Sequence, residues 1–296
     1  MFTGKVLIPI DFSKTSEKLC DSIIELKNLG INEVILTHVI ENSYIGIKPH
    51  KLKKYYEERL FSIKQVVDSS IDKVSIKVQI GRGSREILKL ANTEEVSLIL
   101  IASHGRGLIR NFFLGRTVYN VVRKSKKPIL VEKFENLEKE KEENIQIARV
   151  KKFNKILVPT DFSKYAEEVF NKVKKIPTHP EEIIITSIIE SNKDLTEQEI
   201  SISEKLDHLK ETLDKENICD KVSTITRQGT ASREIINLAQ EIKVGIIIMA
   251  TRGKGYFKNL PIGSTAERVA RKSRVPVLLF PLPNQKNNSK NNNETT

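Results

Sequence analysis

A glycine-rich segment with a fixed spacing occurs near the end of each half of the chain. In the first half it runs Ala102-Ser103-His104-Gly105 and, after nine residues, Gly115-Arg116-Thr117. In the second half it runs Ala250-Thr251-Arg252-Gly253 and, after nine residues, Gly263-Ser264-Thr265. Each segment follows an apolar run and precedes an amphipathic stretch, so each predicts a glycine loop between a strand and a helix. The backbone N–H groups of such a loop and the helix dipole both favour a bound phosphate.

Two aspartates stand at equivalent positions in the two halves. Asp11 lies in the segment Lys5–Lys14, and Asp161 lies in the similar segment Lys155–Lys164. An aspartate that follows a strand can accept a hydrogen bond from a bound nucleotide, or it can cap the next helix. We favour the binding role because both halves hold the residue, and the capping role stays open.

The similarity of the two halves indicates an internal duplication. Gly81–Ile87 returns as Gly229–Ile235, in the same order as the aspartate and glycine segments and at an offset of 148 residues. We therefore expect one domain at residues 1–134 and a second at residues 153–283. The stretch between them, residues 135–152, is rich in Glu and Lys and predicts a charged linker. The apolar-poor tail, residues 284–296, predicts disorder.

Each copy shows apolar runs that alternate with helical patterns. In the first copy the predicted strands are Lys5–Ile10, Glu33–Ile40, Val74–Ile80, Ser97–Ala102 and Pro128–Glu132. A helix is expected to begin around Ser13, to carry Leu19, Ile23 and Leu26 on one face, and to end before Gly30. This alternation predicts an α/β fold of two tandem doubly wound domains, each a five-stranded parallel sheet of order 3-2-1-4-5 flanked by helices.

The predicted strand order also predicts where a ligand would lie. In doubly wound sheets, ligands bind beyond the carboxyl ends of the strands, at the point where the strand order reverses. Asp11 follows the first strand and Ala102 ends the fourth, so this order places the aspartate and the glycine loop on opposite sides of one crevice. The last strands, 128–131 and 276–280, are apolar sheet edges that need covering.

Composition narrows the class of protein. The chain has 296 residues, a formal net charge of +12 and two cysteines, Cys20 and Cys219, at non-equivalent positions. We expect free thiols and a cytoplasmic protein without a membrane span. Most of the basic residues alternate with acidic ones, as in Lys51–Lys64, and there is no tryptophan. This pattern is typical of a solvated surface, so we consider nucleic acid an unlikely partner.

These segments resemble the universal stress protein family in its tandem two-domain form. The resemblance rests on Pro-Ile-Asp-Phe-Ser and Pro-Thr-Asp-Phe-Ser, on Thr37–Glu41, on Gly81 and Gly229, and on the two glycine loops. It covers both halves except the linker and the tail. It implies a stress-response protein that binds ATP, with Mg²⁺ accompanying the phosphates. It also implies that the last strands of the two domains meet, so that one chain mimics a dimer, and a further homodimer is possible.

The resemblance also implies roles for individual residues. Asp11 and Asp161 match the acidic residue near the adenine and ribose, and Val39 and Ile188 match the backbone position that lines the adenine pocket. The phosphate and ribose loop is matched by a larger set of residues: Gly105, Gly115, Thr117, Gly253, Gly263, Ser264 and Thr265.

Two departures from the family pattern bear on affinity. Ala102 and Ala250 replace its first glycine, and Arg116 replaces a small hydroxyl residue in the first copy only. The arginine could pair with a phosphate or fill the site. We expect the second site to bind more tightly than the first.

Two other classes of function stay open. One is a slow ATPase in which Asp11 or Asp161 positions water or metal. The other is a ligand-free interaction or scaffold protein. No phosphate-binding Gly-x-x-x-x-Gly-Lys-Ser/Thr segment, no dinucleotide fingerprint, no nucleophile elbow and no metal-ligand spacing of histidines is present in the sequence. No catalytic residue and no resident metal site is predicted.

Overall fold

The structure is a computed structural model of the chain. It describes residues 4–41, 49–103, 114–134, 152–190, 195–255 and 262–281, without the side chains of residues 49, 50, 195 and 196. Gly105, most of the predicted linker (135–151) and the predicted disordered tail (284–296) lie outside the described residues. No helix in the part of the chain that is described is long and apolar enough to cross a membrane.

The first copy contains the five parallel strands that its apolar runs predict, in the order β3-β2-β1-β4-β5. Predicted and observed strand ends differ by two residues at most. The strands are β1 (Gly4–Pro9), β2 (Ile31–Ile40), β3 (Lys73–Ile80), β4 (Leu98–Ala102) and β5 (Ile129–Glu132). The longer helices are α3 (Pro49–Val67), α4 (Gly83–Thr93) and α5 (Arg116–Lys124).

The second copy repeats this arrangement with the strand order β8-β7-β6-β9-β10. Its strands are β6 (Lys155–Pro159), β7 (Glu182–Ile189), β8 (Lys221–Gln228), β9 (Ile246–Ala250) and β10 (Val277–Phe280). Its helices are α6 (Lys164–Val173), α7 (Leu195–Lys215), α8 (Ala231–Glu241) and α9 (Ser264–Lys272). The predicted fold class is therefore confirmed in both halves.

The helix expected after Ser13 begins there but is not continuous. It is divided into α1 (Lys14–Lys18), a 3-10 turn (η1, Leu19–Ser22) and α2 (Ile23–Asn28). The sequence here is rich in Ser, Thr and Cys, whose side chains compete for backbone hydrogen bonds. Ser16 Oγ, for example, donates to the carbonyl of Ser13 at 3.0 Å. Leu19, Ile23 and Leu26 are nevertheless buried together as predicted, and Gly30 has the expected positive φ of 93°.

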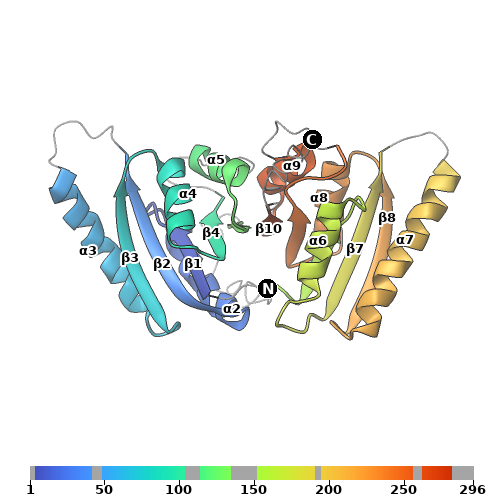
Figure 1. The fold of residues 1–296 in the computed structure, drawn as a ribbon, viewed down its shortest axis with the longest axis horizontal. Helices are drawn as coiled ribbons and strands as arrows, with labels where there is room; N and C mark the ends of the chain where they lie inside the picture. Colours follow the sequence, from blue (N-terminus) through green and yellow to red (C-terminus); the bar gives the residue numbers. More distant parts are fainter. Residues whose placement is uncertain are drawn as a thin grey trace, which may run out of the picture.

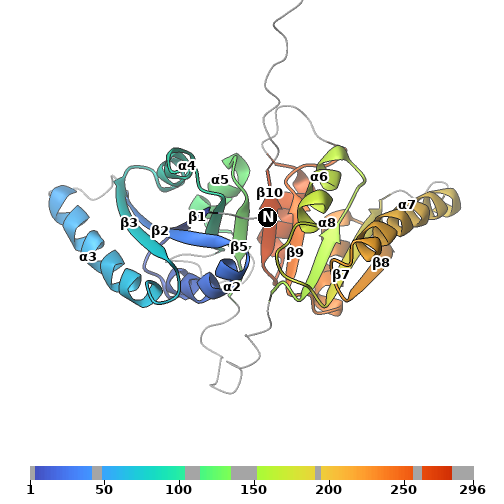
Figure 2. The same cartoon turned by 60° about the horizontal axis from the view of Figure 1, so that its bottom comes forward.

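The two domains join edge to edge into one ten-stranded sheet. β5 and β10 pair antiparallel, with Leu130 opposite Leu278 at the centre of the pairing. The expectation that the last strands meet is confirmed. Figures 1 and 2 show the two copies on either side of this junction. The pairing covers two apolar strand edges that water would otherwise face.

Helices cover both faces of this sheet. The core on one face lies under α4, α5, α8 and α9 and continues from one domain to the other. The core on the opposite face lies under α1, α2, α3, α6 and α7, and it too contains residues of both domains. Because antiparallel edge strands are related by a two-fold axis perpendicular to the sheet, equivalent helices of the two copies share a face.

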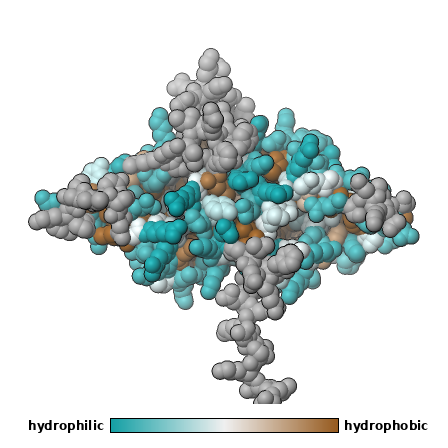
Figure 3. Space-filling view, turned by 90° about the horizontal axis from the view of Figure 1, so that it is seen from above, coloured by the Kyte–Doolittle hydropathy of each residue, from teal (hydrophilic) through white to brown (hydrophobic). Residues whose placement is uncertain are grey.

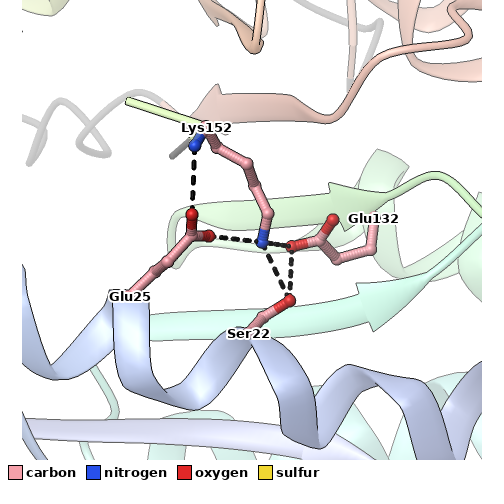
Figure 4. A network of polar contacts seen from close by, with 4 residues as sticks. All are labelled: Ser22, Glu25, Glu132 and Lys152. Carbon is pink, nitrogen blue, oxygen red and sulfur yellow. Dashed lines mark hydrogen bonds and ion pairs between the residues drawn. The ribbon is translucent and has the colours of Figure 1, made fainter. Parts of the chain in front are cut away.

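A buried ion-pair network links the start of the second domain to the first (Figure 4). Lys152 Nζ lies 2.7 Å from Glu132 Oε1, 2.8 Å from Glu25 Oε2 and 2.8 Å from Ser22 Oγ. Burial alone would lower the pKa of the Lys152 ammonium, but the two carboxylates outweigh burial and raise that pKa above its usual range. Lys152 is the last residue of the stretch predicted as a linker, and it contacts both halves of the molecule.

Candidate functional site

The carboxyl end of β6 brings together the aspartate and the glycine loop of the second copy. Asp161 Oδ1 accepts a hydrogen bond from the Ser163 amide at 3.0 Å, and its Oδ2 accepts one from the Lys254 amide at 2.6 Å. A Cβ atom on Gly253 would overlap Asp161 Oδ2, so a larger residue at this position would displace the carboxylate. The structure thus unites Asp161 and Gly253, two residues that lie far apart in the sequence.

Asp11 occupies the equivalent place at the end of β1. Its Oδ1 accepts hydrogen bonds from the amide of Ser13 at 3.0 Å and from the Ser13 hydroxyl at 2.5 Å. Ser13 in turn caps α1 by accepting from the Ser16 amide at 3.2 Å. The aspartate therefore supports the helix cap, as the alternative interpretation of the sequence proposed. Gly105, its expected partner in the loop, lies outside the described residues.

Backbone strain follows each aspartate, and no sequence pattern predicted it. Phe12 and Phe162 adopt φ angles of 58° and 57°, in the left-handed region that bulky residues rarely enter. Such strain persists only where surrounding contacts hold it, and it gathers at functional sites. Its recurrence in both copies shows that the two units share the same bend directly after the aspartate.

Gly115 and Gly263 are the N-cap residues of α5 and α9. Their amides close the bend after β4 and β9, by donating to Ser103 O at 3.0 Å and Thr251 O at 2.7 Å. Neither glycine supplies a side-chain cap, and the first helical bonds run from Tyr119 and Glu267 back to these glycines. The amides of residues 116–118 and 264–266 thus have no acceptor within their helices. These amides, rather than those of the glycines, are the donors left for an anion.

The two residues that follow each of these glycines differ in exposure. Arg116 and Ser264 are exposed, whereas Thr117 and Thr265 are half-buried. The exposed position of Arg116 means that its side chain does not fill the space behind the helix start.

A glutamate at the end of β2 and β7 adjoins the same region in each copy. A Cβ on Gly83 would lie 3.3 Å from the Thr117 methyl carbon and 3.5 Å from Glu41 Oε1. In the second copy Glu190 Oε1 accepts a hydrogen bond from the Ala231 amide, the first of α8, at 3.0 Å. We did not predict a role for these glutamates. Their repetition after the second strand of each copy was the signal that could have found them.

Val39 and Ile188 lie two residues before these glutamates. Each is the next-to-last residue of its strand, β2 or β7. Both are half-buried and pack against the core under α4, α5, α8 and α9.

The two copies differ in the residues around the phenylalanine that follows the aspartate. In the first copy the Phe12 ring lies 4.9 Å from the His38 ring, and the Arg59 guanidinium lies 3.9 Å from the centre of the Phe12 ring. His38 Nδ1 is also 2.7 Å from the carbonyl of Ile10. The second copy has the small, buried Ser187 at the position of His38. The neighbourhood of Asp11 is therefore more crowded with rings than that of Asp161.

The described residues contain no group of three or more His, Cys, Asp or Glu side chains that could hold a metal ion. Cys20 and Cys219 are free thiols, as expected.

Comparison with known proteins gives matches over both halves. The model of the universal stress protein family matches residues 3–133 and 152–281. Universal stress protein MJ0577 of Methanocaldococcus jannaschii is 31% identical over 155 residues, which is 45% of this chain and 96% of that protein. Universal stress protein Sll1654 of Synechocystis is 28% identical over 137 residues, 44% of this chain and 86% of that protein. The crystal structure of a universal stress protein from Archaeoglobus fulgidus covers 93% of this chain and 95% of its own, with 26% identity and a TM-score of 0.72.

Proposed function

The chain belongs to the universal stress protein family, and from that premise we propose that it binds ATP or a related adenine nucleotide as a sensor or regulatory module. The observation that carries the proposal is the close contact of Asp161 with Gly253 and Lys254 beside the open start of α9. A carboxylate suited to a ribose or adenine and a set of unpaired amides suited to phosphate converge there from distant parts of the sequence.

The residues around α9 fit the phosphate end of such a ligand. The amides of residues 264–266 point along the helix dipole, whose positive end stabilises negative charge by about 0.3–1 kcal/mol. Ser264 and Thr265 add hydroxyl groups. The Lys254 amide is engaged by Asp161 (2.6 Å), so a nucleotide phosphate would compete with that carboxylate for it. The phosphates of ATP would bring the negative charge, and the Mg²⁺ ion that accompanies them would bring the metal.

We further propose that the second site binds more tightly than the first. The second copy keeps Ser264 and the buried Ser187, whereas the first has Arg116 and the ring cluster around Phe12. We expect tighter binding at the second site because Ser264 can donate a hydroxyl hydrogen bond where the first copy has Arg116, and because fewer rings surround the second aspartate.

A pair of matched glycine substitutions tests the proposal. A Cβ on Gly263 would lie 3.3 Å from Thr251 O, and one on Gly115 would lie 3.8 Å from Ser103 O. We expect Gly263→Val to weaken ATP binding, measured by isothermal titration calorimetry, by about tenfold or more, which corresponds to 1.4 kcal/mol. Gly115→Val is the control and should change the affinity of the tighter site less than twofold. Unchanged binding in Gly263→Val together with lost binding in Gly115→Val would overturn the assignment.

The two alternative functions give different results in simple assays. The sequence shows no general base poised on an attacking water, so we expect no hydrolysis at or above the ordinary enzyme rate of about 1 s⁻¹. A faster rate would favour the ATPase. If millimolar ATP leaves the melting temperature unchanged, the interaction protein is favoured, because a ligand of the native state stabilises it. The two free thiols accord with a cytoplasmic location.

A further inference from the structure

A groove lies on the first domain between α3 and the broken helix formed by α1, η1 and α2. These elements cover the same face of the sheet, as Figure 2 shows for α2 and α3. The groove has a volume of about 420 Å³. Its main lining residues come from α1 and η1 on one side and from α3 on the other: Glu17, Cys20 and Asp21, then Arg59, Ile63 and Val66.

Exposed hydrophobic side chains gather on the helices that form this groove. Six large hydrophobic side chains among the described residues are exposed, and four of them lie on α2 and α3: Ile24, Tyr55, Phe61 and Val66. Val66 lines the groove and is 72% exposed, and Ile24, three residues after Asp21, is 60% exposed. On the face seen in Figure 3, hydrophobic residues are only scattered among hydrophilic ones. Clustered exposed hydrophobic residues mark interaction surfaces.

The second copy has polar residues at all four of these positions. α7 aligns with α3 at an offset of 146 residues, which matches the buried Leu206 to the buried Leu60, and the first helices align at an offset of 150. The two copies share one fold, so the fold itself does not require the exposed hydrophobic residues of the first. The residues equivalent to the four hydrophobic ones are, in chain order, Lys174, Ser201, Asp207 and Thr212.

The second copy also closes the equivalent space. Phe170 stands at the position of Cys20, and its ring is buried in the core. Lys174, at the end of α6, forms an ion pair with Glu216, directly after α7. A ring therefore replaces a small thiol, and a charge pair joins the two helices where the first copy exposes an isoleucine. Within the described part of the chain, this kind of open groove belongs to the first copy.

The groove carries opposite charges on its two sides. Glu17 and Asp21 are exposed on one side. On the other side, the Arg59 guanidinium lies 3.9 Å from the centre of the Phe12 ring. Burial, followed by the charges of Asp21 and Glu17, raises the pKa of the Cys20 thiol to about 12, so both carboxylates lie near that side chain. In the part of the chain that is described, none of the three charged residues forms an ion pair.

The two ends of the groove also differ. The broken helix and α3 run in the same direction, because each connects strands of one parallel sheet. Arg59 contacts Phe12, just before the start of α1. Val66, about two turns further along α3, therefore lies toward the end of the groove where α2 places Ile24. Apolar residues thus gather at one end, and Glu17 and Arg59 lie nearer the other.

We propose that this groove is the contact surface of a homodimer, in which two copies of the chain face each other across a two-fold axis that runs along the groove. Such an axis places Glu17 of one protomer opposite the partner's Arg59, and Ile24 opposite the partner's Val66. A surface with opposite charges on its two sides is complementary to its own image, whereas a strongly acidic or basic partner would be repelled by one side. Because each chain offers one such groove, the pair closes and does not extend into a fibre.

Substitutions that copy the second domain test the proposal. The groove variant Ile24→Lys/Val66→Thr introduces the residues that the second copy holds at these positions, so we expect the fold to tolerate them. The control variant Ile80→Thr/Ile200→Lys makes the same two kinds of change at exposed isoleucines of β3 and α7, outside the groove. Sedimentation velocity between about 1 and 200 µM protein measures self-association, and thermal denaturation checks folding.

We expect the wild type to pass from monomer to dimer over this range. A dissociation constant of about 10 µM is expected, because the contact of two helix pairs is at the small end of specific interfaces. The groove variant should dimerise at least about tenfold more weakly, and the control variant should stay within about twofold of the wild type. At the lowest protein concentration, both variants should melt at the temperature of the wild type.

A charge swap tests the two-fold arrangement separately. Glu17→Arg and Arg59→Glu should each be monomeric, because like charges then face each other across the axis. Mixed in equal amounts, the two variants should form a heterodimer, since every facing pair again has opposite signs. Failure of the mixture to associate, while both variants are folded, would contradict this arrangement.

Three results would overturn the proposal: a wild type that stays monomeric at the highest concentration, dimerisation that is unchanged in the groove variant, or equal weakening in the groove and control variants. The first result would leave the groove to a different protein, and the second would place the dimer contact elsewhere.

Discussion

At the scale of single residues, the contact between Gly253 and Asp161 matters most. The methyl group that alanine would add at this position would overlap Asp161 Oδ2, an atom of the proposed binding site. We expect Gly253→Ala to lower the free energy of unfolding by about 1–3 kcal/mol, the usual cost of overpacking. It should also weaken ATP binding.

The control for this prediction is the double variant Gly253→Ala/Asp161→Ala, which removes the clash. Denaturant unfolding should show its stability partly restored while ATP binding stays weak. If Gly253→Ala alone is as stable as the wild type, the packing of the loop on Asp161 is wrong.

Cys20 supplies a second test at the residue scale. Burial, together with the nearby charges of Asp21 and Glu17, raises the pKa of its thiol to about 12. The thiolate is the reactive form, so Cys20 is expected to react with iodoacetamide at pH 8 far more slowly than free cysteine. Peptide mass spectrometry of the native protein measures its modification. Complete labelling of Cys20 within minutes in native buffer, at the rate of the unfolded chain, would contradict this.

Residue roles were only partly predictable from the sequence. The pairing of Asp161 with Gly253 follows from a strand order that apolar runs reveal, because parallel strands place their carboxyl ends at one edge. The left-handed φ of Phe12 and Phe162 could not be predicted, since it depends on tertiary contacts rather than on the preference of phenylalanine. The carboxylate hydrogen bond to the Lys254 amide likewise requires the folded backbone.

At the scale of elements, the first helix of each copy shows which features follow from apolar spacing and which depend on local hydrogen bonds. Apolar spacing correctly predicted which residues are buried. It did not predict the 3-10 turn Leu19–Ser22, because that turn depends on competition between hydroxyl side chains and the helix. α6, with Val169, Phe170, Asn171 and Lys172 at the positions equivalent to Leu19–Ser22, is uninterrupted.

The Glu182 carboxylate on β7 contacts Lys155 on β6 and both Lys221 and Ser223 on β8, and its titration can be followed. Partial burial of Glu182 would raise its pKa, but hydrogen bonds from Ser223, Lys155 and Lys221 outweigh burial and lower that pKa to about 2 from 4.5. Because the folded-state pKa is depressed, the stabilisation is complete above about pH 4.5 and is lost as the pH falls towards 2.

We therefore expect Glu182→Gln to lower the free energy of unfolding at pH 7 by about 1–2 kcal/mol, after allowance for solvent screening. The unfolding free energy of the variant should also depend less on pH between 5 and 2 than that of the wild type. Urea denaturation at a series of pH values measures both. The same acid dependence in the variant and the wild type would show that other carboxylates are responsible.

At the scale of the whole molecule, the two domains are held by a sheet junction and by one buried charge cluster. Glu132, of which 3% of the side chain is exposed, faces Lys152 at 2.7 Å. Removing the Glu132 charge leaves the buried Lys152 ammonium with a single carboxylate, Glu25, so Glu132→Gln should destabilise the protein by about 1–3 kcal/mol. The double variant Glu132→Gln/Lys152→Met should recover part of this loss, as thermal denaturation can show.

The pKa of Lys152 adds a pH signature to that test. Because this pKa is raised, the cluster's contribution is present below about pH 10.5 and is lost as the pH rises above it. A Glu132→Gln protein as stable as the wild type would contradict the role of the cluster. The apolar edges 128–131 and 276–280 predicted only that these strands need covering, and the resemblance to the family implied that they meet. The cluster could not be predicted, because Lys152 lies in a stretch whose composition indicates only a charged linker.

The central claim, that each unit is built to hold an adenine nucleotide, is tested most directly by native mass spectrometry of the full chain with millimolar ATP. We predict an adduct with the mass of an adenine nucleotide on the wild type, and loss of the most persistent adduct in Gly263→Val. A wild-type spectrum without any nucleotide adduct, recorded from folded protein, would contradict the claim.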